Sequence, residues 1–171
     1  MDFEYVIKNR CSVRHFSDKV VELDKINKIL SAAMCAPTAK NKQPFRIYLL
    51  ESEEALNKLD SLTLCRYNAP IVALFTYNED EMWVNEEDKD INSGIEDVSI
   101  VATHFMLEAY DLGIDTCWVN LFNNKKLEEV FNLNKKEHSV LLMPLGYRLD
   151  GVHPSRLHNE SKKVEELVKI L

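Results

Sequence analysis

The sequence contains no apolar run that approaches the roughly 20 residues needed to span a bilayer. Residues 1–10 also lack the apolar core of a signal peptide. The four cysteines, at positions 11, 35, 65 and 117, include no CxxC pair, so free thiols are expected. Because free thiols are typical of a reducing compartment, we expect a cytoplasmic protein without a membrane partner.

Positive charge is in the minority. The chain has 21 Lys and Arg residues against 28 Asp and Glu residues, which gives a net charge of −7. The resulting field repels nucleic acid and anionic membranes, so neither is expected as a partner. The five histidines show no metal-ligand grouping, and no nucleophile, base and acid arrangement typical of a triad is recognisable, so we expect no metal.

Helical and extended patterns alternate along the 171 residues. Apolar residues recur every three or four positions over 22–35 and 95–112, which predicts amphipathic helices, whereas the apolar run at 71–76 is typical of a central strand. The length fits one domain, 1–171, with an α+β or α/β fold around one sheet. The predicted helices are 3–9, 22–35, 53–59 behind a Ser52 cap, 95–112, 125–131 and a tail from 160, and the predicted strands are 46–50, 71–76, 115–119 and 139–145.

A small basic cluster stands near the start of the chain. In an extended segment, side chains two residues apart point the same way, so Arg10, Ser12 and Arg14 share one face while Cys11 and Val13 point inward. Guanidinium groups match phosphate oxygens in a bidentate fashion, which indicates a phosphate or anion clamp. A solvated basic edge, paired with nearby carboxylates, explains the same spacing.

A second candidate segment, 36–45, reads Ala-Pro-Thr-Ala-Lys-Asn-Lys-Gln-Pro-Phe. Two prolines and a set of small residues indicate a rigid loop that leads from a helix to a strand. Asn41 and Gln43 offer paired donors and acceptors of the kind that bind the edge of a planar heterocycle. A turn in which both amides satisfy their own backbone is the alternative.

Taken in register, the two segments resemble the N-terminal signature of the nitroreductase family. The first contributes Arg-x-Ser-Val-Arg-x-Phe and the second Ala-Pro-Thr-Ala-x-Asn-x-Gln-Pro-Phe, in the family's order and at its separation. Later segments also resemble the family: its long central helix at 97–114, its next strand at Cys117-Trp-Val, its final core strand and Gly-Tyr turn at 143–147, and its late arginine in Pro-Ser-Arg-Leu at 154–157.

The resemblance implies an α+β, nitroreductase-like fold with a central mixed sheet flanked by helices, built as a homodimer with FMN at the subunit interface. Carried over by position, Arg10, Ser12 and Arg156 would hold the phosphate and ribityl chain of FMN. Arg14 would lie near the pyrimidine end of the ring, where a cation favours reduction because reduced flavin is anionic there.

Other parts of the implied FMN site come from distant positions. Thr38, Ala39 and Asn41 would be supplied by the partner subunit, and Gln43 would support their loop. Backbone groups near Asn120 would meet flavin N5. The full set of implied cofactor-binding residues is Arg10, Cys11, Ser12, Arg14, Pro37, Thr38, Ala39, Asn41, Gln43, Asn120, Pro144, Leu145, Gly146 and Arg156.

The implied activity is that of an FMN-dependent oxidoreductase. It would pass electrons from NADH or NADPH, through flavin N5, to a nitroaromatic, quinone or similar small acceptor by a ping-pong mechanism, with no catalytic side chain required. An FMN-binding carrier or redox sensor without robust turnover is the alternative. The acidic segment 78–92 favours NADH slightly over the more anionic NADPH. The chain departs from larger relatives at Pro154, where a lysine is common, and in its short segment after Arg156.

Overall fold

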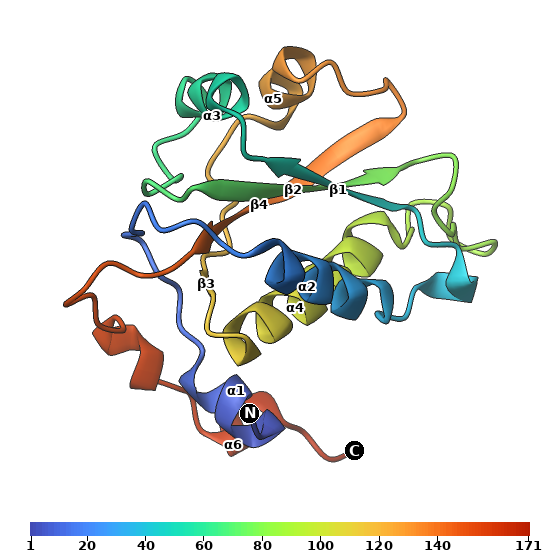
Figure 1. Ribbon diagram of the computed structural model, residues 1–171. Helices are drawn as coiled ribbons and strands as arrows, with labels where there is room; N and C mark the ends of the chain where they lie inside the picture. Colours follow the sequence, from blue (N-terminus) through green and yellow to red (C-terminus); the bar gives the residue numbers. More distant parts are fainter.

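A four-stranded sheet in the order β1-β2-β4-β3 runs through the centre of the protein, whose computed structural model describes residues 1–171 (Figure 1). All neighbouring strands in it pair antiparallel. The strands are β1 (Phe45–Leu50), β2 (Ile71–Asn78), β3 (Asp115–Thr116) and β4 (Glu137–Gly146).

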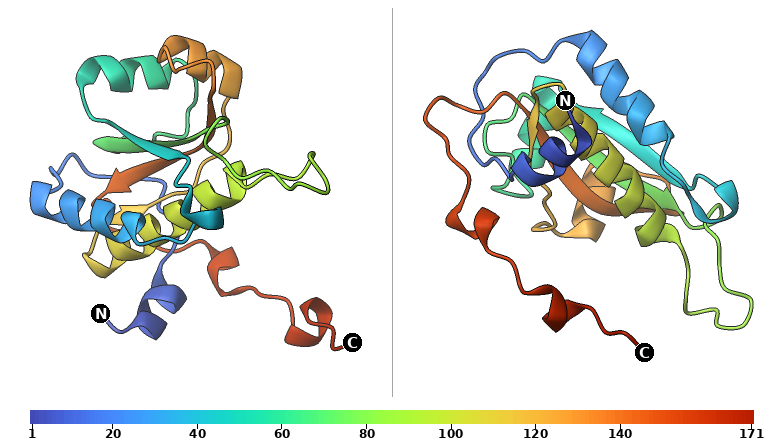
Figure 2. Two further views of the ribbon diagram at one scale, coloured as in Figure 1. Left: turned by 90° about the vertical axis from the view of Figure 1, so that its right-hand side faces the viewer. Right: turned by 90° about the horizontal axis from the view of Figure 1, so that it is seen from below.

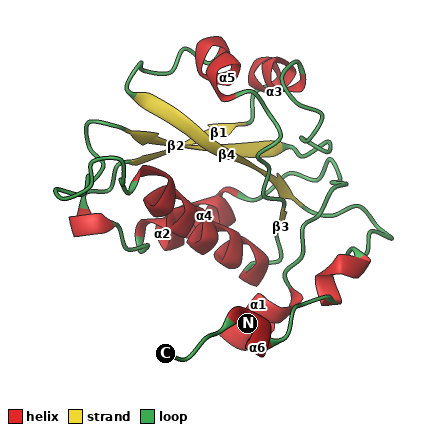
Figure 3. Ribbon diagram, turned by 180° about the vertical axis from the view of Figure 1, so that it is seen from behind, coloured by secondary structure: helices red, strands yellow, loops and turns green.

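Helices cover both faces of this sheet. Figures 1 and 3 show α3 and α5 on one face and α2 and α4 on the other, with α1 beyond α4. No helix is both long and apolar enough to cross a membrane. The helices are α1 (Phe3–Asn9), α2 (Leu23–Met34), α3 (Glu53–Asp60), α4 (Gly94–Asp111), α5 (Asn124–Val130) and α6 (Val164–Leu167), with 3-10 turns η1 (Ala39–Asn41) and η2 (Arg156–Asn159).

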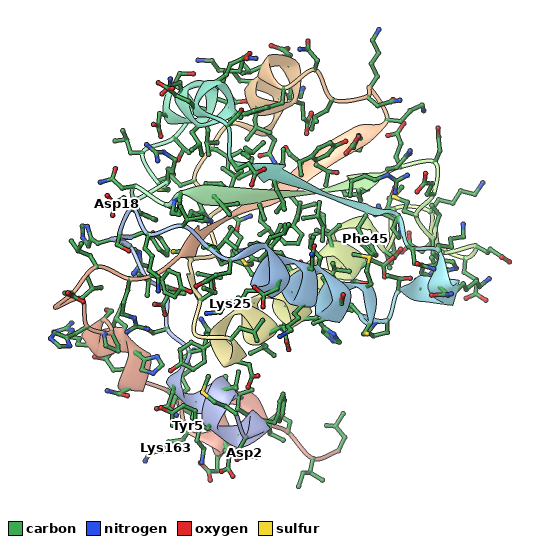
Figure 4. All side chains as sticks on the ribbon, viewed as in Figure 1. Asp2, Tyr5, Asp18, Lys25, Phe45 and Lys163 are labelled. Atoms are coloured by element: carbon green, nitrogen blue, oxygen red, sulfur yellow. The ribbon has the colours of Figure 1, made fainter.

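The alternation of side chains along β2 divides the core into two layers. Phe75 faces α2 and α4, where its ring meets Phe105 edge-on with the centroids 5.3 Å apart. Val72 and Leu74 face α3 and α5 and pack with Leu127. Side chains fill the space between the helices and the sheet on both sides (Figure 4). Burial on both faces explains the continuous apolar run of this strand.

Two predicted elements are shorter than expected. Pairing at β3 is interrupted after Thr116 and returns only as a bridge between Val119 and Leu142. The interruption lies opposite Pro144, whose carbonyl accepts from the Cys117 N–H at 3.1 Å but which has no N–H to return. The predicted helical tail is reduced to the single turn of α6, because its apolar side chains are exposed and an isolated short helix is marginal in water.

The expected mixed sheet is also corrected, while the α+β class is confirmed. The single parallel pairing is a bridge between Ser12 and Thr116. The connection from β2 through α4 to β3 crosses to the opposite end of the sheet, so these two strands run parallel, but β4 lies between them and pairs antiparallel with both. The bridge nevertheless matters, because it fixes the basic segment 10–14 beside β3.

Candidate functional site

The alternation predicted for residues 10–14 is present. Cys11 and Val13 are buried, at 4% and 1% exposure, while Arg10, Ser12 and Arg14 reach the surface. The Val13 N–H donates to the Thr116 carbonyl at 3.0 Å, which holds the segment extended. Together with the start of the C-terminal tail, the segment encloses a depression of about 550 Å³, lined by Arg10, Cys11, Ser12, Arg14, Ser155, Leu157 and His158.

The two arginines of this depression, which we call the anion pocket, have no acidic partner. The other arginines of the chain each pair with a carboxylate: Arg46 with Glu81, Arg66 with Asp60, Arg148 with Asp115, and Arg156 with Glu160. Arg10 and Arg14 form no such ion pair. The alternative interpretation, a basic edge paired with nearby carboxylates, is therefore wrong. Two uncompensated guanidinium groups and a hydroxyl in one depression fit the phosphate of a flavin mononucleotide.

Behind the pocket lies a pair that the sequence reading missed. Arg148 Nε donates to Asp115 Oδ2 at 2.8 Å, and Asp115 is 7% exposed. The hydrogen bonds to Asp115 raise the pKa of Arg148. Arg148 Nη2 also lies 3.7 Å from Cys11 Sγ. The sequence feature that could have indicated this pair is Asp115 itself, a lone acidic residue at the start of an apolar strand.

Cys117 lies beneath the same pocket. Its thiol is buried, and burial raises its pKa, an effect that Arg14 and Ser12 oppose. A thiol with a raised pKa is a weak nucleophile near neutral pH. Cys117 and Cys11 thus pack as small buried residues, and the chemistry that the pocket can perform is anion binding.

The loop at residues 37–43 has a constrained backbone. Lys40, Asn41 and Gln43 all adopt the left-handed region, with φ of 50°, 55° and 48°. Such residues cost on the order of 1–3 kcal/mol each unless their surroundings compensate, and they cluster at functional sites. Thr38 Oγ1 accepts from the Gln43 N–H at 3.1 Å, and Gln43 Nε2 donates to the Asn41 carbonyl at 3.2 Å. The Asn41 side chain and Pro37 are exposed.

This loop and the anion pocket do not meet within one chain. Figures 1 and 2 place the turn at 39–41, drawn in cyan, and the segment at 10–14, drawn in blue, at opposite sides of the protein. The candidate residues therefore fall into two groups: Arg10, Ser12 and Arg14 in one, and Thr38, Ala39 and Asn41 in the other. Within one chain the two groups therefore form separate sites.

The remaining candidates lie along β4 and the segment after β3. Pro144, Leu145 and Gly146 are buried in β4, and a Cβ added at Gly146 would lie 2.9 Å from Pro70 Cδ. The Asn120 side chain is engaged, because Nδ2 donates to the Val140 carbonyl at 2.8 Å and Oδ1 accepts from Trp118 Nε1 at 2.7 Å. No backbone hydrogen bond uses the N–H of Asn120 or Leu121, which leaves both donors open.

Arg156 is the candidate that the structure separates from the others. Its side chain is 88% exposed and lies 3.7 Å from Glu160. It does not line the anion pocket, although its neighbours Ser155 and Leu157 do. These neighbours were missed from the sequence, where their adjacency to Arg156 was the only signal.

The layered α+β fold presents, beside β3 at the sheet edge, a pocket with the guanidinium and hydroxyl donors that suit a phosphate. The chain belongs to the nitroreductase family, whose model matches residues 7–67 and 66–147. This membership confirms the predicted family and the enzyme class, an oxidoreductase.

Individual relatives agree with this placement. The chain is 32% identical to a nitroreductase family protein from Clostridium difficile, with a TM-score of 0.91 over 99% of this chain and 98% of that one. It is 26% identical to a protein of Methanothermobacter thermautotrophicus whose name pairs NADH dehydrogenase with NAD(P)H nitroreductase, over 94% of this chain and 87% of that protein. A structure from Exiguobacterium sibiricum solved in complex with FMN has the same fold, with 21% identity and a TM-score of 0.85 over 100% of this chain and 98% of that one.

Proposed function

We propose that this chain is an FMN-dependent oxidoreductase that passes electrons from NADH or NADPH to a nitroaromatic, quinone or similar small acceptor. When bound, FMN supplies the centre that accepts hydride from one substrate and reduces the next, so the exchange is ping-pong. The whole chain, 1–171, serves as one FMN-binding domain. The absence of cysteine pairing favours a cytoplasmic location.

The observation that carries this proposal is the pair of unpartnered arginines in the anion pocket. Arg10 and Ser12 bind the phosphate end of the cofactor, and Arg14 lies toward its ring. An uncompensated cation near the ring stabilises the negative charge that reduction places on the flavin. The free N–H groups of Asn120 and Leu121 are donors for the reactive edge of the ring.

The same proposal requires a homodimer. The loop at 37–43 lies far from the anion pocket of its own chain, so it completes the site of a second copy. Two exposed apolar surfaces support such an assembly. One is on α1, where Phe3 is 68% and Tyr5 51% exposed; Figure 4 labels Tyr5 there. The other is the tail, which leads away from the rest of the chain in Figure 2 and exposes Leu167 and Val168.

A direct test combines the visible spectrum of the purified protein with its mass by size-exclusion chromatography and light scattering. We expect a yellow dimer with one FMN per chain. Anaerobic NADH should bleach the flavin absorbance, and a nitroaromatic or quinone should restore it over repeated cycles. A colourless monomer that takes up no added FMN would contradict the proposal. Bleaching that no acceptor reverses would favour a flavin carrier or sensor instead.

A further inference from the structure

A buried carboxylate that is not part of the anion pocket reaches the loop at 37–43. Asp97, in the first turns of α4, is 3% exposed and forms no ion pair. Its Oδ1 accepts from the Ala39 N–H at 2.8 Å, and its Oδ2 accepts from the Ser93 hydroxyl at 2.7 Å. A carboxylate is seldom buried without a charged partner unless hydrogen bonds satisfy its oxygens. Here the two donors come from separate segments, the loop at 37–43 and the start of α4.

Ser93 extends this link to a third segment. Its hydroxyl accepts from the Trp83 N–H at 3.1 Å, and its own N–H donates to the Trp83 carbonyl at 2.9 Å. The start of α4, the acidic hairpin around Trp83 and the turn at 39–41 are thus joined through one buried carboxylate. Figure 1 shows these three segments together at one end of the sheet.

The loop depends on this link more than on its other contacts. Its remaining hydrogen bonds are internal, among Thr38, Ala39, Asn41, Lys42 and Gln43, or exposed, from Lys42 Nζ to the Met82 carbonyl. Among the hydrogen-bond partners of residues 38–43, Asp97 is the buried side chain. A loop with three left-handed, non-glycine residues keeps that conformation only when its surroundings over-determine it.

We propose that Asp97 is a positioning residue for the cofactor: through the Ala39 N–H it holds the loop at 38–43 in the conformation that contacts FMN across the dimer interface. The inference rests on the proposed function, which places this loop against the flavin of the partner subunit. A loop held in its binding conformation before the ligand arrives avoids the ordering cost of binding and so raises affinity.

Two substitutions of Asp97 separate the effect of its hydrogen-bond geometry from the effect of its charge. Asp97→Ala removes the acceptor and leaves a buried N–H without a partner, which frees the loop. Asp97→Asn keeps an oxygen for the Ala39 N–H and offers its amide to the Ser93 hydroxyl, which retains a free lone pair. The positioning role therefore predicts rescue by Asn. A matched control is Glu137→Ala, which removes another buried carboxylate, one that bonds Tyr48 and Thr76 and none of residues 37–43.

The experiment measures two quantities in each folded variant. One is the exchange rate of the Ala39 amide in FMN-free protein by NMR, and the other is the Kd for FMN by quenching of flavin fluorescence. In Asp97→Ala we expect both to rise about tenfold or more, and in Asp97→Asn to stay within about threefold of wild type. Glu137→Ala should lower stability while leaving both quantities unchanged.

Several outcomes would overturn the inference. The first is an Asp97→Ala protein with unchanged FMN affinity, and the second is equal weakening by Asp97→Ala and Glu137→Ala. If Asp97→Ala fails to fold, the exchange rate of the Ala39 amide in the wild-type protein provides the test. An amide that exchanges as fast as one in an unstructured chain would show that Asp97 does not hold the loop. A wild-type protein that takes up no FMN overturns the proposed function and this inference with it, whereas the first two outcomes overturn this inference alone.

Discussion

The guanidinium of Arg148 donates hydrogen bonds from two nitrogens, Nε and Nη2, to the carboxylate of Asp115, directly behind the anion pocket. The distance from Nε to Oδ2 is 2.8 Å. The backbone N–H of Arg148 also donates to this carboxylate at 3.3 Å. The pair ties the short strand β3 to the chain that follows β4. Asp115 is nearly fully buried and Arg148 about two-thirds buried, so solvent screens the attraction between their charges less than it would in a surface pair.

Loss of this pair is expected to destabilise the protein. Asp115→Ala leaves a partly buried guanidinium and a backbone N–H without their acceptor, so the free energy of unfolding should fall by about 2–3 kcal/mol. Urea denaturation checks this value. Glu4→Ala is the control, since its pair with Lys8 is exposed on both sides and should cost less than about 0.5 kcal/mol. Equal effects of the two substitutions would contradict the prediction.

The two pocket arginines are expected to differ in their effects. Arg10→Ala removes a charge-assisted bond to the phosphate, worth about 1.5–3 kcal/mol, so the Kd for FMN should rise on the order of ten- to a hundredfold. Arg14→Ala should lower the flavin midpoint potential more than it weakens binding, because it removes a cation that stabilises the reduced ring. Fluorescence titration and potentiometry measure the two quantities.

A control for both arginines is Lys58→Ala on α3, whose lysine pairs with Glu54 and does not line the anion pocket. It should change neither the Kd nor the potential. Unchanged FMN affinity in both arginine variants would remove the support for the anion pocket as the cofactor site.

The cysteines should differ in their rates of alkylation. Cys35 is exposed, whereas Cys117 is buried and burial raises its pKa. A raised pKa means less thiolate at any given pH, so iodoacetamide should label Cys35 first and Cys117 only at higher pH or after unfolding. Peptide mass spectrometry of native protein over time measures both rates, and Cys35→Ser provides the blank. Labelling of Cys117 as fast as Cys35 would be the contrary result.

Alkaline stability should depend on Tyr48. Partial burial, with 37% of the residue exposed, and a hydrogen bond to Glu137 at 2.9 Å raise the pKa of Tyr48 from 10.0 to about 12. A folded pKa above the unfolded value favours the protonated, folded state, so this contribution is full below about pH 10 and is lost as the pH rises toward about 12. Tyr48→Phe should lose about 1 kcal/mol at neutral pH but show a shallower alkaline decline.

Urea denaturation at about pH 8 and about pH 11 compares the two proteins. Some decline should persist in Tyr48→Phe, because the pKa of Tyr67 is also raised to about 12, mainly by burial. An alkaline decline as steep in the variant as in wild type would show that Tyr48 contributes nothing to it.

Local structure could be read from the sequence because it depends on neighbours in the chain. The apolar spacing that predicted helices at 22–35 and 95–112 reflects the pitch of the helix, and α2 and α4 begin and end within a residue or two of those bounds. The alternation at Arg10, Ser12 and Arg14 reflects the pleat of an extended chain, and it too is present. The family signature likewise lay in local segments and their order.

Pairings between distant segments were decided only by the tertiary structure. Whether Arg10 and Arg14 pair with a carboxylate depends on what folds beside them, and neither forms an ion pair: Asp60, which lines a depression with Arg14, pairs with Arg66 instead. Asp97 meets Ala39 across 58 positions of sequence, and Arg148 meets Asp115 across 33, separations at which spacing carries no information. The outward direction of Arg156 and the distance between the loop and the pocket follow from the same physics, because side-chain contacts are set by packing and not by periodicity.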